Sequence, residues 1–250
     1  PGRALIERGI PWSPSSLFAA GEKGAWYDPA DLTTLFQNSN GTGAVAVGDP
    51  VGYIGDKSGN GYHAIQATAG NRPVLRQDGN GRYYLEADGT DDILVASIPE
   101  ITLNRMLLVS TAQLDSTGST GSDHAIACGH SVDANPLAYI SRNSTSIQAG
   151  WRGTAGDGTA SAVFGVGAPA DGRHVFSGVF NATTGTIRMD GLDKTTGSGA
   201  PATAKFDRIA IMGLQRSVPA NWAPGRFYKG LVLFRLATAN EVTAAEAWAA

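Results

Sequence analysis

The sequence predicts an all-β protein in which many short strands are joined by tight turns. Three observations support this prediction. Glycine accounts for 33 of 250 residues, and charged residues make up only 16%. Short apolar segments alternate with turns rich in Asp, Asn and Gly, most clearly over residues 52–97. This balance is typical of antiparallel β proteins, and a chain of this length can form a single large core.

Charge and composition weigh against several classes of function. A net charge of −3 provides no basic surface for nucleic acid. No apolar run approaches the roughly 18 residues of a membrane-spanning helix, so we expect no membrane insertion. Residues 1–10 have no apolar centre, and we expect no secretory signal there. Cys128 is the only cysteine, so packing rather than an intrachain disulfide must stabilise the fold.

Residues 1–25 are predicted to form an extended arm, because prolines and glycines interrupt them and no apolar period is visible. Such an arm can lie against a neighbouring subunit, and its apolar residues Trp12, Leu17 and Phe18 would make that contact. We expect a single domain over residues 26–250. It opens with one helical turn, for which Asp28 is the expected N-cap.

The strands are predicted from two patterns. Alternation of apolar and polar residues with period two marks half-buried strands. Near-continuous apolar runs predict central strands that are covered on both faces. Turn signals predict hairpins after residues 140 and 180, and Asn240 or Thr238 caps a final short helix. We expect about twelve strands and two helices, with the clearest strands at 83–87, 93–95, 106–112, 125–128, 137–140, 147–151, 174–180, 186–191, 208–213 and 229–235.

The turn at residues 56–61 matches part of a calcium-binding loop. Asp56 and Asn60 occupy its first and fifth positions, but Ala67 stands where the loop needs a bidentate glutamate. We therefore reject an EF-hand. A structural turn, in which the Asp56 side chain accepts hydrogen bonds from the backbone, is favoured over an unrelated calcium site with Asp56 and Asn60 as ligands. We expect no other cofactor.

Two short motifs mimic catalytic or cofactor sites and are rejected. Residues 129–133 begin like a nucleophile elbow, but Asp133 occupies a position that requires glycine. Residues 165–170 match part of a dinucleotide-binding fingerprint, but Pro169 and the lack of a following helical pattern exclude it. We interpret residues 129–133 as a polar loop after a buried strand.

Carbohydrate binding needs an aromatic platform that is flanked by polar side chains. Two groups in or beside Gly/Pro-rich loops offer this combination. In each group, the alternative is that the tryptophan packs against the sandwich or a neighbouring subunit. The first group is Trp151 with Gln148, Arg152 and Asp157, and the second is Trp222 with Asn221 and Arg226.

Four stretches, at 56–64, 87–92, 174–191 and 227–241, resemble in their order and spacing the laminin-G-like, concanavalin-A-like jelly-roll superfamily. The resemblance covers residues 50–250 and implies a jelly-roll β-sandwich of two antiparallel sheets with short helices. Glycosidases of this superfamily carry acidic residues spaced two apart on one strand. Glu86 and Asp88 come closest, but Asp88 is expected in the turn that follows, so we expect no enzyme.

A narrower resemblance, over residues 15–95, is to jelly-roll proteins of tailed-bacteriophage virions. It rests on segments 16–29 and 48–52, which precede the Asp-Lys-Ser-Gly turn at residues 56–59 in this chain and a similar turn in those proteins. It implies a non-enzymatic head-decoration or tail-surface protein that is assembled in the host cytoplasm, contacts other virion proteins and forms a homo-oligomer. The alternative is an adhesin module that recognises host surface glycans, and a glycoside hydrolase is the third reading.

Overall fold

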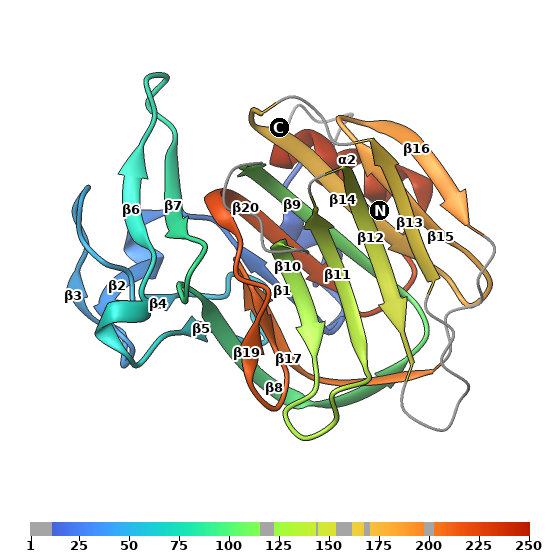
Figure 1. The fold of residues 1–250 in the computed structure, drawn as a ribbon, viewed down its shortest axis with the longest axis horizontal. Coiled ribbons are helices and arrows are strands. Elements are labelled where there is room, and N and C mark those ends of the chain that lie inside the picture. The colour runs from blue at the N-terminus through green and yellow to red at the C-terminus, as the bar shows by residue number, and fades with distance from the viewer. Residues whose placement is uncertain (1–11, 116–122, 144, 154–161, 168–170, 198–202) are drawn as a thin grey trace.

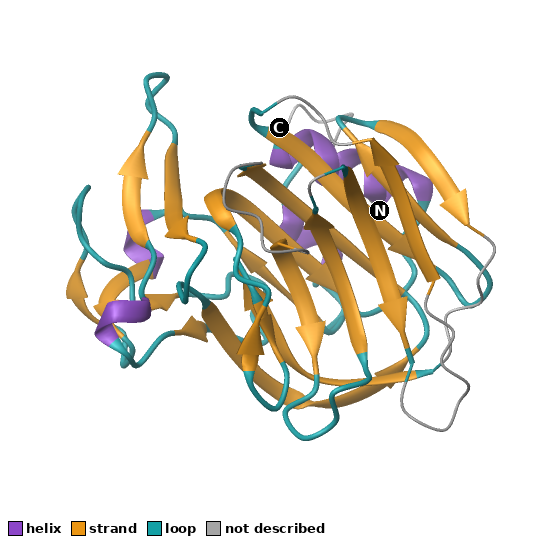
Figure 2. Ribbon diagram, in the orientation of Figure 1, coloured by secondary structure: helices purple, strands orange, loops and turns teal. Residues whose placement is uncertain are grey.

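A computed structural model describes residues 12–115, 123–143, 145–153, 162–167, 171–197 and 203–250. Within them, two large antiparallel sheets pack face to face and confirm the predicted β-sandwich (Figures 1 and 2). A third, two-stranded sheet pairs β18 (Leu214–Gln215) with β19 (Pro219–Ala220).

Sheet A is formed by β1 (Gly24–Tyr27), β6 (Val74–Gln77), β7 (Tyr83–Asp88), β9 (Met106–Leu114), β14 (His174–Phe180), β15 (Gly185–Met189), β16 (Leu192–Gly197) and β20 (Pro224–Leu233). Their order in the sheet is β16-β15-β14-β9-β20-β7-β6, and β1 pairs with β20. Strands that are distant in sequence, such as β9 and β20, are therefore neighbours at the centre of the sheet.

Sheet B is formed by β2 (Leu35–Asn38), β3 (Thr42–Ala44), β4 (Tyr53–Ile54), β5 (Ala64–Ile65), β8 (Leu94–Leu103), β10 (Asp123–Gly129), β11 (Leu137–Arg142), β12 (Ser146–Arg152), β13 (Ala162–Gly167) and β17 (Ala204–Ile211). Their order is β13-β12-β11-β10-β17-β8-β5-β4-β2-β3. The short strands β2–β5 and the β6–β7 hairpin form a lobe at one side of the sandwich, at the left of Figure 1.

The main core lies between the two sheets. Alternation along β9 directs Leu108 and Ala112 into this core and Val109 to the outer face. Strands β9 and β10 are buried along almost their whole length, which confirms the two central strands predicted from continuous apolar runs. The largest fully buried side chains are aromatic: Trp151, Tyr27, Phe176, Phe180, Phe206 and Phe227.

A second apolar cluster covers part of the outer face of sheet A. There, helix α2 (Ala239–Ala249) and the 3-10 turn η1 (Pro14–Leu17) pack over Leu107 and Val109 of β9. Helix α2 begins after Thr238, whose side chain forms a reciprocal capping box with Glu241. One half of this outer face is thereby sealed.

The segment that was expected to be a free arm is part of the fold from Trp12 onward. Leu17 and Phe18 are buried in the outer apolar cluster, and Trp12 packs against it. These side chains cover this chain's own sheet, because the outer face of β9 is apolar and needs a cover. Residues 1–11 lie outside the described part of the chain.

Short elements differ from their predictions. The helical turn after Pro29 is the 3-10 turn η2 (Leu32–Thr34), and its cap is Asp31 because that carboxylate accepts the N–H of Thr33. The described residues contain twenty strands, more than expected, since two-residue strands such as β4 and β5 carry no periodic signal. The final helix and both predicted hairpins are confirmed.

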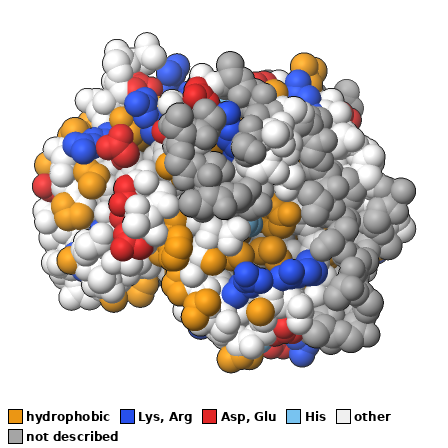
Figure 3. Space-filling model, in the orientation of Figure 1, with side chains coloured by type: hydrophobic (Ala, Val, Ile, Leu, Met, Phe, Trp, Pro, Cys, Tyr) orange, Lys and Arg blue, Asp and Glu red, His pale blue; other side chains and the backbone are white. Residues whose placement is uncertain are grey.

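No helix among the described residues combines the length and apolar character needed to cross a membrane. In the space-filling view, acidic and basic side chains lie side by side over the lobe at the left (Figure 3). The visible side of this lobe therefore presents mixed charge.

Candidate functional site

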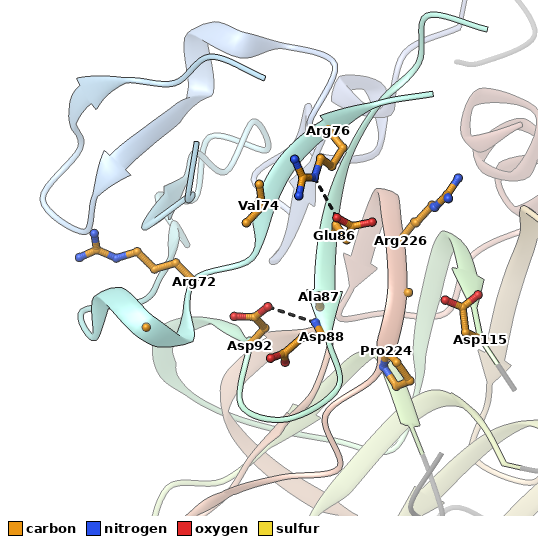
Figure 4. A pocket seen from close by; sticks show the side chains of 12 residues that line it. Arg72, Val74, Arg76, Glu86, Ala87, Asp88, Asp92, Asp115, Pro224 and Arg226 are labelled. Carbon is orange, nitrogen blue, oxygen red and sulfur yellow. Dashed lines mark hydrogen bonds and ion pairs between the residues drawn. The ribbon is translucent and has the colours of Figure 1, made fainter. Parts of the chain in front are cut away.

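The outer face of sheet A is open where α2 and η1 do not cover it. A cleft of about 530 Å³ lies there, over β6, β7 and the start of β20 (Figure 4). We refer to it as the outer-face cleft. It is lined by Gly70, Arg72, Val74, Arg76, Glu86, Ala87, Asp88, Asp92, Asp115, Pro224, Gly225 and Arg226.

Strand register brings the polar side chains of the cleft onto one face. Glu86 of β7 lies opposite Val74 of β6 on one side and opposite Arg226 of β20 on the other. Arg226 in turn lies opposite Gln113 of β9. Directly opposed residues of antiparallel strands point to the same face, so one row of side chains crosses four strands beneath the cleft.

A glycine allows β20 to reach this position. Gly225 has a φ of 135°, and a Cβ added there would overlap the main-chain oxygen of Gln113. Any other residue would push β20 away from β9. The sequence Pro224-Gly225-Arg226 therefore places the Arg226 side chain on the open face.

Opposite charges lie side by side in the cleft (Figure 4). The Nε atom of Arg76 donates to Oε2 of Glu86 at 2.8 Å, and both side chains are about 40% exposed. Solvent screens such a pair, so it adds little to stability and its atoms stay accessible. Arg72 borders the cleft from the lobe and donates to the main-chain oxygens of Gln66 and Ala67.

Two tyrosines whose rings are tilted by 40° to each other form a wall beside the cleft. The ring centroids of Tyr84 and Tyr228 are 5.2 Å apart, and the Arg226 guanidinium lies 4.9 Å from the centroid of Tyr84. The strand register shifts between Phe227 and Lys229. This β-bulge turns Tyr228 and Lys229, which are adjacent in sequence, toward the same outer face.

Three carboxylates gather at the end of β7 and in the turn that follows it. Oxygens of Asp88, Asp91 and Asp92 lie within 4.8 Å of one another, an arrangement that could hold a cation. Backbone hydrogen bonds already engage two of them, because Asp92 accepts the N–H of Asp88 and Asp88 accepts the N–H of Thr90. Burial raises the pKa of Asp92 to about 6, despite the hydrogen bond from Asp88, and the neighbouring carboxylates add to the rise.

Glu86 and Asp88 share the outer face, which corrects the expectation that Asp88 lies in a turn. Strand β7 extends through Asp88, so two carboxylates are spaced two residues apart on one strand. The glycine at position 89 suggested an earlier strand end. The pairing of Asp88 with Pro224 extends the strand by one residue.

The first predicted sugar platform is not on the surface. Trp151 is 1% exposed, and its ring packs against Phe180 and Phe206 at centroid distances of 5.4 and 5.3 Å. It cannot stack on a sugar, and the alternative interpretation, packing inside the sandwich, is the observed one. The side chain points inward because it follows Ile147 at even spacing along β12.

The residues predicted to flank Trp151 are separated from it. Gln148 and Arg152 alternate with the inward positions of β12 and therefore lie on the outer face of sheet B. Arg152 donates to the main-chain oxygens of Ala134 and Asn135. Asp157 lies outside the described residues.

The second predicted sugar site is divided. Arg226 lines the outer-face cleft. Trp222 is half-buried beside Gly213, and its indole N–H is enclosed. Asn221 adopts a φ of 56°, and its main-chain oxygen accepts the N–H of His124. Arg226 is the predicted sugar-binding residue that the structure places in the cleft.

The turn at 56–61 is structural, as favoured from the sequence. The Asp56 carboxylate accepts the backbone N–H groups of Trp26 and Tyr62 at 3.0 and 2.9 Å. The Asn60 amide donates to main-chain oxygens just before and at the start of β1. These bonds tie the turn to β1, so both side chains that were weighed as calcium ligands are engaged with protein groups.

The sequence matches no known protein family, and no curated protein is similar to it in sequence. Solved structures are similar in fold. The Trypanosoma rangeli sialidase matches with a TM-score of 0.57 and 13% identity over 91% of this chain and 32% of the sialidase. The receptor-binding domain of botulinum neurotoxin type G matches with a TM-score of 0.54 and 12% identity over 78% of this chain and 48% of that one.

A third similar structure is the binding domain of botulinum neurotoxin DC in complex with SialylT. It has a TM-score of 0.56 and 10% identity over 87% of this chain and 51% of that one. The chain therefore spans about half the length of the neurotoxin domains and about a third of the sialidase that it matches. At these identities the matches establish the β-sandwich fold.

Proposed function

We propose that this domain binds carbohydrate through the outer-face cleft and does so without catalysis. The observation that carries the proposal is the placement of guanidinium donors and carboxylate acceptors side by side in an open cleft. A sugar hydroxyl both donates and accepts hydrogen bonds, so neighbouring groups of both kinds can bind it. The cleft volume of about 530 Å³ lies within the usual range of small-ligand sites.

The fold lends support to this proposal. The neurotoxin DC binding domain, which has a similar sandwich, was solved in complex with SialylT. A sandwich of this architecture can therefore present a binding site for such a ligand. At 10% identity the similarity establishes the fold and not the site residues. In this chain we assign the site to Arg76, Glu86 and Arg226 of the outer-face cleft.

We propose binding without hydrolysis because of how the carboxylates are held. Glycosidases need one protonated carboxylic acid that reaches the glycosidic oxygen and a second carboxylate beside it. Asp92 is the carboxyl with a raised pKa, but it is 8% exposed and accepts a hydrogen bond from the backbone of Asp88. Glu86 is engaged by Arg76.

A structural role in a virion stays a prediction from the sequence resemblance. The arm residues Leu17 and Phe18, which were expected to bind another subunit, lie inside this fold and give that role no support. The two functions are compatible, because a glycan-binding domain can be part of a virion surface. Sedimentation of the purified chain tests the predicted homo-oligomer separately.

Binding to an array of bacterial surface glycans tests the proposal. Arg226→Ala and Glu86→Gln should each weaken binding at least tenfold, because each removes a charged partner of the sugar. Arg105→Ala, an exposed arginine between β8 and β9, serves as the control and should bind as the unaltered protein does. Circular dichroism of each variant checks that the fold is retained.

Two outcomes would contradict the proposal. If no glycan binds, the proposed function is wrong, and if all three variants bind equally, the site lies elsewhere on the surface. Incubating the protein with any glycan that it binds, followed by chain-length analysis, tests the absence of catalysis. Shortened products would show that the cleft hydrolyses its ligand.

A further inference from the structure

A second cleft on the outer face of sheet A gathers positive charge. It has a volume of about 300 Å³, and its lining includes Tyr228, which contacts Tyr84. We refer to it as the cationic cleft. It is lined by Ala30, Gly81, Arg82, Tyr83, Arg173, Tyr228, Lys229 and Ala250.

Lys229 is fixed in this cleft by neutral groups. Its Nζ atom donates to the main-chain oxygen of Trp248 at 2.6 Å and lies 5.2 Å from the centroid of the Trp248 ring. The β-bulge at Tyr228 aims Lys229 toward helix α2. An ammonium group has three N–H donors, so this arrangement leaves donors for a further partner.

Arg173 approaches from the segment before β14. Its guanidinium lies 5.7 Å from the centroid of the Tyr228 ring, and Nη1 is 3.4 Å from the main-chain oxygen of Ala250. Arg82 contributes from the β6–β7 hairpin, where its other neighbour is Asp78 at 3.6 Å. The three cations thus come from three separate segments and converge on one cavity with an aromatic wall.

Positive charge in the cleft exceeds the negative charge that is close by. Among the described residues, no ion pair within 4 Å joins Lys229 or Arg173 to an acidic side chain. Burial lowers the pKa of Lys229; Asp28 opposes this effect, and Arg173 and Arg82 add to it. A group that is held close to like charges gains most from a bound anion.

We propose that the cationic cleft binds an oxyanion, that is, a carboxylate, sulfate or phosphate group. An arginine fork and a lysine point charge are the side chains that bind such groups. This inference goes beyond the proposed function and does not depend on it, since the two clefts use different side chains.

Titration with inorganic and simple organic anions tests the inference. Sodium sulfate, phosphate and acetate are added to ¹⁵N-labelled protein at an ionic strength held constant with sodium chloride. We expect saturable shifts at Lys229 and Arg173 with at least one anion, and the tightest ligand identifies the oxyanion. Lys229→Met and Arg173→Ala should each weaken that binding at least tenfold, whereas Arg105→Ala should leave it unchanged.

A second measurement reports the charge of the site directly. A bound anion should raise the pKa of Lys229, which NMR of its ¹³Cε atom detects. Failure of all three anions to bind, or binding that survives both substitutions, would overturn the inference. If the unaltered protein binds an anion but no glycan, only the proposed function is contradicted. If it binds a glycan but none of the three anions, only this inference is contradicted.

Discussion

The guanidinium of Arg226 lies 4.9 Å from the centroid of the Tyr84 ring, on the open half of the outer face of sheet A. Tyr84 is only 6% exposed, so the arginine covers the ring. A ligand in the outer-face cleft therefore meets the guanidinium, and the ring beneath it fixes where the guanidinium lies. This contact links the aromatic wall to the charged lining of the cleft.

Replacing Tyr84 separates the role of its ring from that of its hydroxyl. Tyr84→Leu should weaken glycan binding two- to five-fold, because a cation–π contact of this kind is worth about 0.5–1 kcal/mol. Tyr84→Phe keeps the ring and should bind as the unaltered protein does. Calorimetric titration with the best glycan from the array measures both. Equal losses in the two variants would mean that the hydroxyl matters and the ring does not.

The attachment of helix α2 depends on a buried ion pair. Glu246 is 5% exposed and accepts from Nε of Arg188 at 2.7 Å. Glu246→Gln should lower the free energy of unfolding by about 3 kcal/mol, since it removes the buried carboxylate partner of Arg188 and leaves only the exposed Asp193 to balance its charge. Glu100→Gln, at an exposed carboxylate that contacts Lys205 and His130, should cost much less, because solvent screens this charge. Urea unfolding measures the loss of stability in both variants. Equal losses would contradict the expectation that the buried ion pair matters more than the exposed one.

Asp92 makes stability depend on pH. Its pKa is about 6 in the folded protein and ordinarily 3.8, so the neutral form is favoured by folding. Its contribution to stability is present below pH 4 and is lost as the pH rises through about 6, by at most about 3 kcal/mol. Asp92→Asn should therefore gain stability relative to the unaltered protein between pH 4 and 7. Thermal melts of both proteins across this pH range measure the difference, and curves that stay parallel from pH 4 to 7 would contradict the role of Asp92.

Trp151 should matter for stability and not for binding. Trp151→Ala removes a fully buried ring that packs on two phenylalanines and should cost about 3–5 kcal/mol. The milder Trp151→Phe should stay folded and keep the glycan affinity of the unaltered protein. Chemical unfolding tests the first variant and calorimetry the second. Weakened binding in folded Trp151→Phe would place the sugar near this residue.

Sequence patterns predicted the central architecture well because burial leaves a periodic or continuous apolar signal. Strands β9 and β10 are sealed on both faces, and their apolar runs are unbroken. The turn at Asp56 was predicted from local chemistry, since the spacing of Asp, Ser and Gly is enough to specify it. Two-residue strands such as β4 had no comparable signal.

The candidate site could not be predicted in the same way. The outer-face cleft forms because the register brings Glu86 and Arg226 together from positions 140 residues apart, and no local pattern encodes that pairing. Trp151 was a misleading signal, because it ends the predicted strand at 147–151 beside a Gly-rich segment, and this position did not show that its side chain points into the core. Tyr84, Glu86 and Asp88 alternate along β7, but Asp88 was expected in the turn, so the sequence did not predict that its side chain shares a face with Glu86.

The cover of sheet A comes from two distant parts of the chain, since η1 precedes the whole sandwich and α2 follows it. A nascent chain on the ribosome can pair its strands only up to the point of synthesis, and the apolar outer surface of β9 stays bare until residues 239–249 emerge. Premature termination before that helix should therefore yield a chain that sticks to chaperones. Quality control in the cell would then detect the missing helix as exposed hydrophobic surface.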